Sequence, residues 1–170
     1  MGLDTYFYGV DKRTIVNPKT KKTTTFDCSS DNEIAYFRKN YCLMEWFEKH
    51  WDMEVENCVD YFVDKDDIDA LIKDCHLAID LVNDATGKND YDFTDVIEGI
   101  APDVEEQLKK LFPMNSWRSG RRWNYQTQSY DLGERKFDGH DYNEVKEIIR
   151  VLSDLSHWDY NDKLIFSNWW

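Results

Sequence analysis

Apolar side chains recur at helical spacing over residues 31–51, the longest such stretch in the chain. Four of them follow one another at intervals of three or four residues: Ile34, Phe37, Tyr41 and Met44. Further aromatic positions widen this stripe beyond one narrow face, which is typical of a helix that packs on two sides. A side-chain oxygen of Asp31 or Asn32 would accept hydrogen bonds from the first turn. The pattern predicts a central helix over residues 31–51.

A second amphipathic pattern, between Asp64 and Gly87, is the clearest in the chain. Its apolar residues repeat with the period of a helix: Ile68, Leu71, Ile72, Cys75, Ala78, Ile79 and Val82. Asp64 is a suitable N-cap, and Gly87 is suited to end the helix. The opposite face carries carboxylates: Asp66, Asp67, Asp69, Asp74 and Asp80. We therefore expect one rigid element to carry much of the acidic surface.

Shorter patterns predict the remaining elements. Alternating apolar and polar residues, or β-prone residues beside turn signals, indicate strands in several segments: residues 1–10, both sides of an Asn17-Pro18 turn, 58–63, 122–130 and 163–170. Pro102 opens a short helix that ends near Leu111, and Asp141 is expected to cap a last helix. The order lacks the regular alternation of a doubly wound sheet. It predicts a single α+β domain over residues 1–170, in which an antiparallel or mixed sheet packs against three to four helices. The terminal strands could pair in this sheet.

Net charge changes this picture, because the excess of −13 is not evenly spread. Between Asp52 and Glu106 there are 18 acidic residues against three lysines, a local charge of −15, whereas the rest of the chain carries +2. Such a region repels nucleic acid and attracts basic surfaces, including those that normally hold nucleic acid. The alternative is a solvated helix face that only aids solubility. The first interpretation predicts a basic protein partner bound through six residues: Asp64, Asp66, Asp67, Asp69, Asp74 and Asp80.

Two segments carry a family resemblance. The opening MGLDTYFYG and the segment YFRKNYCLMEWF resemble a family of small phage and prophage proteins that begin MGLDMYL and carry YWRKxNxIHxWF in the first long helix. The similarity extends to ENC at residues 56–58, LIKDC at 71–75 and LFP at 111–113. Tyr41 and Met44 stand here where that family has Asn and His.

The resemblance implies a phage origin. Many anti-CRISPR proteins are small, acidic phage proteins without an enzyme signature, so by analogy we expect an inhibitor that binds a Cas nuclease in the host cytoplasm and blocks nucleic-acid loading.

Enzyme motifs are absent from the sequence. It has no GxxxxGK[ST] or GxGxxG loop, no GxSxG turn and no HExxH helix, so no catalytic residue is assigned. The alternative function is a small metal-binding phage protein or a metal-dependent enzyme. Zinc prefers Cys and His, and four such residues lie at the ends of elements that should meet: His50, Cys58, Cys75 and His76. No CxxC or HxxxH pair supports this site, and core thiols with surface histidines are the competing interpretation.

Two other groups could carry chemistry. The run WRSGRRW, Trp117 to Trp123, could grip phosphates, contact a partner or pair with the chain's own carboxylates. His140 beside Asp138 and Asp141, or His157 beside Asp154 and Asp159, could transfer protons, although such neighbours are usually solvated. We expect the four cysteines to be reduced and those at 42 and 75 to be buried. The sequence contains no run of about 18 apolar residues, so it predicts no membrane helix.

Overall fold

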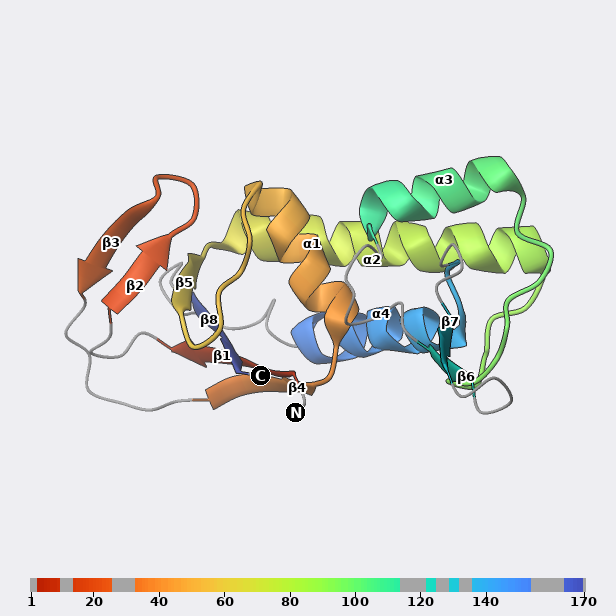
Figure 1. Cartoon of the computed structure of the whole chain (residues 1–170). Coiled ribbons are helices and arrows are strands. Elements are labelled where there is room, and N and C mark those ends of the chain that lie inside the picture. The colour runs from red at the N-terminus through yellow and green to blue at the C-terminus, as the bar shows by residue number, and fades with distance from the viewer. Residues whose placement is uncertain are drawn as a thin grey trace.

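Eight strands and four helices make up the part of the chain that the computed structural model describes (Figure 1), which comprises residues 3–9, 14–25, 33–113, 122–124, 129–131, 136–153 and 164–169. The strands are β1 (Asp4–Gly9), β2 (Thr14–Asn17), β3 (Lys22–Thr25), β4 (Glu33–Arg38), β5 (Asp60–Val63), β6 (Arg122–Asn124), β7 (Ser129–Asp131) and β8 (Leu164–Trp169). The helices are α1 (Tyr41–Trp51), α2 (Lys65–Thr86), α3 (Pro102–Leu111) and α4 (Gly139–Leu152).

Six strands form one mixed sheet in the order β3-β2-β5-β8-β1-β4. The β2–β5 pair is parallel, and the other neighbours are antiparallel. The terminal strands β1 and β8 do pair, with Phe7 opposite Phe166. β6 and β7 form a separate antiparallel pair, so the predicted 122–130 strand contains β6 and the first two residues of β7. These elements confirm the predicted α+β fold.

Aromatic rings join the sheet to α1. The Phe47 ring of α1 lies 4.6 Å from that of Phe166 and 6.2 Å from that of Phe7, measured between ring centroids. One turn later, Trp51 lies 5.6 Å from Tyr61 of β5. Each buried ring removes about 150–250 Å² from water, so this cluster supplies much of the hydrophobic stabilisation. The other helices pack in sequence: α4 contacts both α1 and α2, and α3 packs on α2 (Figure 1).

The predicted central helix over residues 31–51 is wrong in its first half. Residues 33–38 form the edge strand β4, in which Ala35 and Phe37 are buried while Tyr36 and Arg38 are exposed. That alternation has the period of a strand. Phe37 fits both patterns, because its spacing to Tyr41 is helical although the chain turns between them. Pairing with β1 decides the outcome, since β4 completes the sheet edge.

Two residues separate β4 from α1. Lys39 has a left-handed backbone, with φ of 57°, and its N–H donates to the carbonyl of Leu3. Asn40 is the N-cap, and its Oδ1 accepts from the Leu43 N–H at 3.0 Å. The predicted caps, Asp31 and Asn32, lie outside the described residues.

Other boundaries follow the sequence closely. α2 begins after Asp64 and ends at Gly87, whose φ of 68° is left-handed, as predicted. α4 begins earlier than expected, because Asp138 rather than Asp141 is its N-cap. β5 begins at Asp60, two residues after the predicted start. No helix in the described ranges has the length and apolar character needed to cross a membrane.

Candidate functional site

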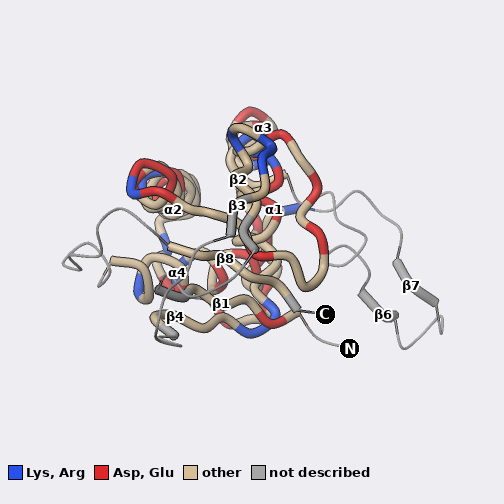
Figure 2. The backbone as a smooth tube through the Cα atoms, turned by 90° about the vertical axis from the view of Figure 1, so that its left-hand side faces the viewer, with Lys and Arg blue, Asp and Glu red and all other residues tan. Residues whose placement is uncertain are grey.

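Exposed carboxylates are concentrated where the sequence predicts them. Twelve of the 18 acidic residues between Asp52 and Glu106 have exposed side chains, and we call these twelve the acidic surface. Its members are Asp52, Glu54, Glu56, Asp66, Asp69, Asp80, Asp84, Asp90, Asp92, Glu98, Asp103 and Glu106. Figure 2 shows acidic positions along both α2 and α3, with basic positions among them. The surface therefore extends over two helices and their connections rather than over one face of α2.

The six predicted partner-binding residues divide into two groups of three. Asp66, Asp69 and Asp80 are exposed on α2, and they belong to the acidic surface. Asp69 pairs with Lys65 one turn earlier, which is a weak exposed pair. The other three predicted residues, Asp64, Asp67 and Asp74, make contacts within the fold, and of these only Asp67 is buried.

Asp64 and Asp67 form a capping box at the start of α2. The Asp64 carboxylate accepts from the Asp67 N–H at 3.0 Å, and the Asp67 carboxylate accepts from the Asp64 N–H at 3.1 Å. Asp67 is only 2% exposed, and its Oδ1 lies 3.1 Å from Lys19 Nζ and 3.0 Å from His50 Nε2. This arrangement ties the β2–β3 hairpin and the end of α1 to the start of α2.

The same contacts shift two pKa values. Burial alone would raise the pKa of Asp64, but the hydrogen bonds from Lys19 and from the Asp67 N–H hold it below its ordinary value. For Lys19, burial opposes the shift, while hydrogen bonds and charge from Asp64 and Asp67 raise the pKa above its ordinary value. Both groups therefore stay charged at neutral pH, as a structural ion pair requires.

Asp74 positions an indole. Its Oδ2 accepts from Trp46 Nε1 at 2.9 Å and lies 3.8 Å from Lys49 Nζ. Burial lowers the pKa of Lys49, although Asp74 partly compensates. Because Trp46 is fully buried, its indole N–H cannot donate to water, and the hydrogen bond to Asp74 satisfies it instead. Asp74 thus connects α2 to α1.

The four predicted metal ligands do not form a cluster. His50 contacts Asp67, and Cys75 is fully buried in the core, where desolvation raises the pKa of its thiol. Cys58 is exposed, and so is His76 on α2, whereas Cys42 and Cys75 are buried as expected. Cys75 and His76 are consecutive in a helix, so their side chains diverge.

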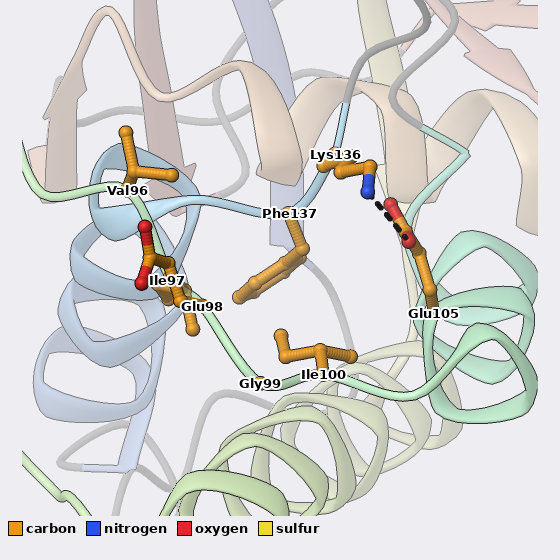
Figure 3. A pocket seen from close by; sticks show the side chains of 8 residues that line it. All are labelled: Val96, Ile97, Glu98, Gly99, Ile100, Glu105, Lys136 and Phe137. Carbon is orange, nitrogen blue, oxygen red and sulfur yellow. Dashed lines mark ion pairs between the residues drawn. The ribbon is translucent and has the colours of Figure 1, made fainter.

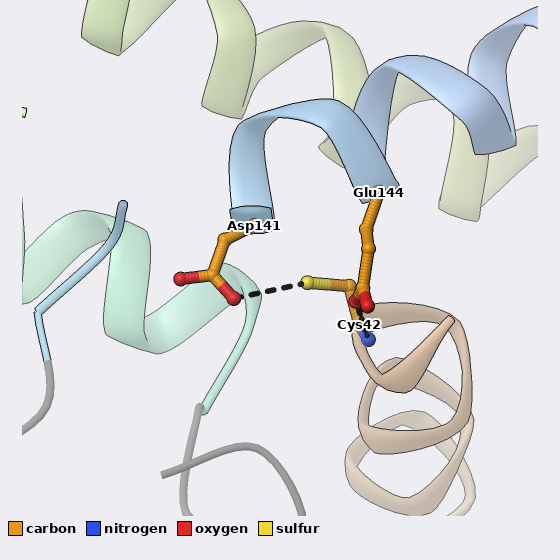
Figure 4. Close-up of side chains that lie close together, drawn as sticks. All are labelled: Cys42, Asp141 and Glu144. Carbon is orange, nitrogen blue, oxygen red and sulfur yellow. Dashed lines mark hydrogen bonds between the residues drawn. The ribbon is translucent and has the colours of Figure 1, made fainter. Parts of the chain in front are cut away.

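A different set of metal-ligating side chains does converge. Among the described residues, Cys42, Asp141 and Glu144 place one ligand atom each within 4.8 Å of one another, and all three are buried (Figure 4). The Cys42 thiol lies 3.7 Å from Asp141 Oδ1. Glu144 Oε1 lies 3.2 Å from His140 Nδ1, so a fourth possible ligand adjoins the cluster.

This cluster joins the first turns of α1 and α4. Glu144 Oε2 accepts from the Cys42 N–H at 2.9 Å, which satisfies one free donor at the start of α1. Asn40 Nδ2 donates to the Glu144 carbonyl at 3.0 Å and to Glu147 Oε2 at 3.1 Å. Negative side chains at a helix N-terminus also interact favourably with the helix dipole. The arrangement can cap two helices, and its ligand types could also hold a metal ion.

Sequence reasoning found part of this cluster. It singled out His140 and Asp141 but missed Cys42 and Glu144. The usable signal is the spacing HDxxE on α4, which places Glu144 one turn after both Asp141 and His140, at i,i+3 and i,i+4. Nothing in the spacing indicates Cys42, because it reaches the cluster only through the packing of α1 on α4.

The described structure thus defines an acidic α+β protein with a buried Cys/Asp/Glu cluster between two helices. Comparison with protein-family models, curated protein sequences and solved structures finds no match.

The run Trp117 to Trp123 lies outside the described residues, apart from the backbone of its last two positions in β6. His157 also lies outside them.

Proposed function

We propose that this protein binds a basic partner through its acidic surface. The observation that carries the proposal is the exposure of twelve carboxylates within a region that contains only three lysines. Asp66 and Asp80 have no hydrogen-bond or ion-pair partner among the described residues, so part of this charge is not neutralised within the described fold. Opposite charge accelerates association with a basic partner. Like charge suppresses binding to acidic molecules such as nucleic acid.

The partner that we propose is a Cas nuclease of the host. Support comes from the resemblance of MGLDTYFYG and YFRKNYCLMEWF to phage proteins and from the charge of the acidic surface. A groove that holds guide RNA or target DNA is rich in Lys and Arg, and clustered carboxylates compete for it. The protein would then act as an inhibitor of nucleic-acid loading rather than as an enzyme.

The test uses purified Cas nucleases and three exposed aspartates. We expect the protein to inhibit cleavage when added before the nucleic acid, with association that slows as salt rises. Reversal of Asp66, Asp69 and Asp80 to Lys should slow association by about 10- to 1,000-fold at low salt, because steering contributes rate factors of that size. Asp67 is excluded from this variant because its buried carboxylate holds the fold together.

Neutral variants provide the matched control. Replacement of the same three residues by Asn removes half as much charge and should give an intermediate loss and an intermediate salt dependence. Association that is unaffected by salt and by both triple variants would rule out the electrostatic mechanism. If the unmodified protein binds another basic protein but none of the Cas nucleases tested, only the choice of partner is refuted.

Metal binding is a second candidate function, favoured by the convergence of Cys42, Asp141 and Glu144. Two ligands of a tetrahedral zinc ion, at about 2.3 Å for sulfur and about 2.0 Å for oxygen, lie roughly 3.5 Å apart. The observed distance of 3.7 Å between Cys42 Sγ and Asp141 Oδ1 is close to that value. Elemental analysis of the purified protein tests this candidate: one zinc per chain that is lost in Cys42→Ser would support it, and zinc that persists in this variant would refute it.

A further inference from the structure

A cavity of about 260 Å³ lies between the connection from α2 to α3 and residues 136–137, shortly before α4 (Figure 3). Its apolar wall consists of Ile97, Ile100 and Phe137. Val96 at the rim is 69% exposed, and the nearby Phe93 is exposed as well. Sites for drug-sized ligands usually begin at about 300 Å³, so this cavity suits a single long side chain better than a cofactor.

The cavity has a rigid frame. The Asp95 carbonyl accepts from the Gly139 N–H at 2.9 Å, and this contact joins the α2–α3 connection to the first residue of α4. Asp95 Oδ2 accepts from the Asp92 N–H, and Asn143 Nδ2 donates to the Tyr91 carbonyl at 2.8 Å. These contacts hold the α2–α3 connection against the start of α4, and both segments border the cavity.

One carboxylate in the wall lacks a hydrogen bond. Glu105, on α3, lines the cavity, and its Oε1 is buried with no hydrogen-bond partner among the described groups. Its other oxygen, Oε2, lies 3.9 Å from Lys136 Nζ, which is too far for a hydrogen bond. Figure 3 shows this ion pair at one end of the cavity, beside Phe137 and Ile100. Neither oxygen of Glu105 therefore has a hydrogen bond among the described groups, and a donor that enters the cavity could supply one to this carboxylate.

We propose that this cavity binds an arginine side chain of a basic partner. The aliphatic stem would lie against Ile97 and Ile100, and the planar guanidinium would stack on Phe137 and donate to Glu105. The charge of the surroundings fits this occupant, since Glu98 also lines the cavity and is exposed. Lys136, at 73% exposure, already supplies a weakly held cation that arginine would displace.

This inference rests on the proposed function, because it names the anchor residue that a basic partner would insert. It is tested without that partner. The probes are acetyl-Gly-Arg-Gly-amide, the same peptide with Lys and the same peptide with citrulline, a neutral analogue of arginine. We expect the arginine peptide to shift the NMR signals of the Ile97 and Ile100 methyl groups in a saturable manner. The lysine peptide should bind more weakly, and the citrulline peptide should not bind detectably.

Three variants locate the binding. Glu105→Gln should weaken the arginine peptide by at least about 10-fold, because a charge-assisted hydrogen bond is lost. Lys136→Ala should tighten it, because the competing cation is removed. Glu106→Gln is the matched control, since Glu106 is the next residue of α3 but is exposed and pairs with Lys110, and its affinity should be unchanged.

Equal weakening by Glu105→Gln and Glu106→Gln would overturn the proposal, because only general charge attraction would remain. Equal binding of the citrulline peptide would also overturn it. Failure of the acidic-surface proposal is separable: the triple Asp66, Asp69 and Asp80 variants would leave partner binding intact while the peptide results stand. Conversely, a partner that remains sensitive to those variants but not to Glu105→Gln would refute the arginine anchor alone.

Discussion

Adjacent aspartates on α2 have opposite roles, although the sequence gives them the same appearance. Asp66 is exposed and has no partner among the described residues, whereas the side chain of Asp67 is almost fully buried and contacts Lys19, His50 and the Asp64 N–H. Their directions differ because consecutive residues of a helix point about 100° apart. Charge alone therefore cannot assign a carboxylate to a partner-binding surface.

The two residues give a matched stability experiment. Asp67→Ala should lower the free energy of unfolding by about 1–3 kcal/mol, because it removes half of a capping box and leaves the Asp64 N–H unsatisfied. Asp66→Ala should change it by less than about 0.5 kcal/mol, as for other surface substitutions. Urea unfolding measures both. Equal effects would contradict the distinction between the structural and the exposed aspartate.

Gly139 is required by a close approach rather than by its dihedral angles. A Cβ at this position would lie 2.1 Å from the Asp92 carbonyl oxygen and 3.0 Å from that of Asp95. We expect Gly139→Ala to destabilise the protein by about 1–3 kcal/mol, because the α2–α3 connection must move away from α4. Amide hydrogen exchange at residue 139 should accelerate in this variant, since the displacement would weaken the hydrogen bond from its N–H to the Asp95 carbonyl.

Gly87→Ala is the control for this prediction. Gly87 has a φ of 68° but nothing within 4 Å of the added Cβ, so its cost is backbone strain of about 1–2 kcal/mol without a clash. Exchange at Gly139 should stay unchanged in this variant. Faster exchange at Gly139 in both variants would indicate general destabilisation instead of a local displacement.

At the scale of elements, the sequence predicts those whose start and end signals agree with their period. α2 has a capping aspartate, a long apolar repeat and a terminal glycine, and its bounds are predicted closely. The segment from Glu33 to Trp51 contains two elements in the structure, because Phe37 and Tyr41 happen to keep helical spacing across the turn. Only the pairing of β4 with β1, a contact between distant segments, distinguishes the two possibilities.

The candidate site has the same limit. Spacing within α4 places Glu144 one turn after Asp141, but Cys42 joins them by the packing of α1, which no local pattern encodes. The predicted ligands Cys75 and His76 fail for a local reason, since neighbours in a helix diverge. The exposed carboxylates of the acidic surface were predictable as a region, and burial then separates the structural residues from the rest.

Asn40 stabilises the junction between α1 and α4 in two ways, as the N-cap of α1 and as a donor to α4. Asn40→Ser should keep an oxygen that caps α1 but lose the donor to the Glu144 carbonyl, whereas Asn40→Ala should lose both. We expect the Ala variant to be less stable than the Ser variant by about 1 kcal/mol, which is the usual value of an N-cap. Thermal unfolding of both proteins measures the difference. Equal stability of the two would show that the connection to α4, and not the cap, is what Asn40 contributes.

At the scale of the whole molecule, two effects of acidity oppose each other. Excess negative charge destabilises the compact state by repulsion, which protonation would relieve. Several individual carboxylates have the opposite effect, because contacts in the folded protein stabilise their charged form and protonation would remove that stabilisation. Hydrogen bonding from the Asp92 N–H, aided by Lys88, lowers the pKa of Asp95, and Lys110 lowers that of Glu106. With Asp64, these groups lie on three different parts of the fold.

The sign of the pH dependence follows from linkage. A carboxyl group whose pKa is lower in the folded state binds fewer protons there than in the unfolded chain, so stability rises with pH through that interval. The contribution of Asp64, Asp95 and Glu106 is complete above about pH 4.5 and is lost as pH falls through the lowered folded values. At 0.15 M salt, repulsion between exposed charges more than about 8 Å apart is largely screened, whereas these short contacts are screened less.

We therefore expect the free energy of unfolding to be nearly constant from pH 7 to pH 5 and to fall below about pH 4. Urea unfolding across this range at 0.15 M salt measures it, and Asp95→Asn should weaken the fall because it removes one of the three groups. Asp80→Asn is the control, since Asp80 is exposed and has no partner among the described residues. A stability that rises steadily as pH falls from 7 to 3 would mean that repulsion within the acidic surface dominates. The charge that we assign to partner binding would then cost the free protein stability, and a basic partner should stabilise it most at low salt, where that repulsion is strongest.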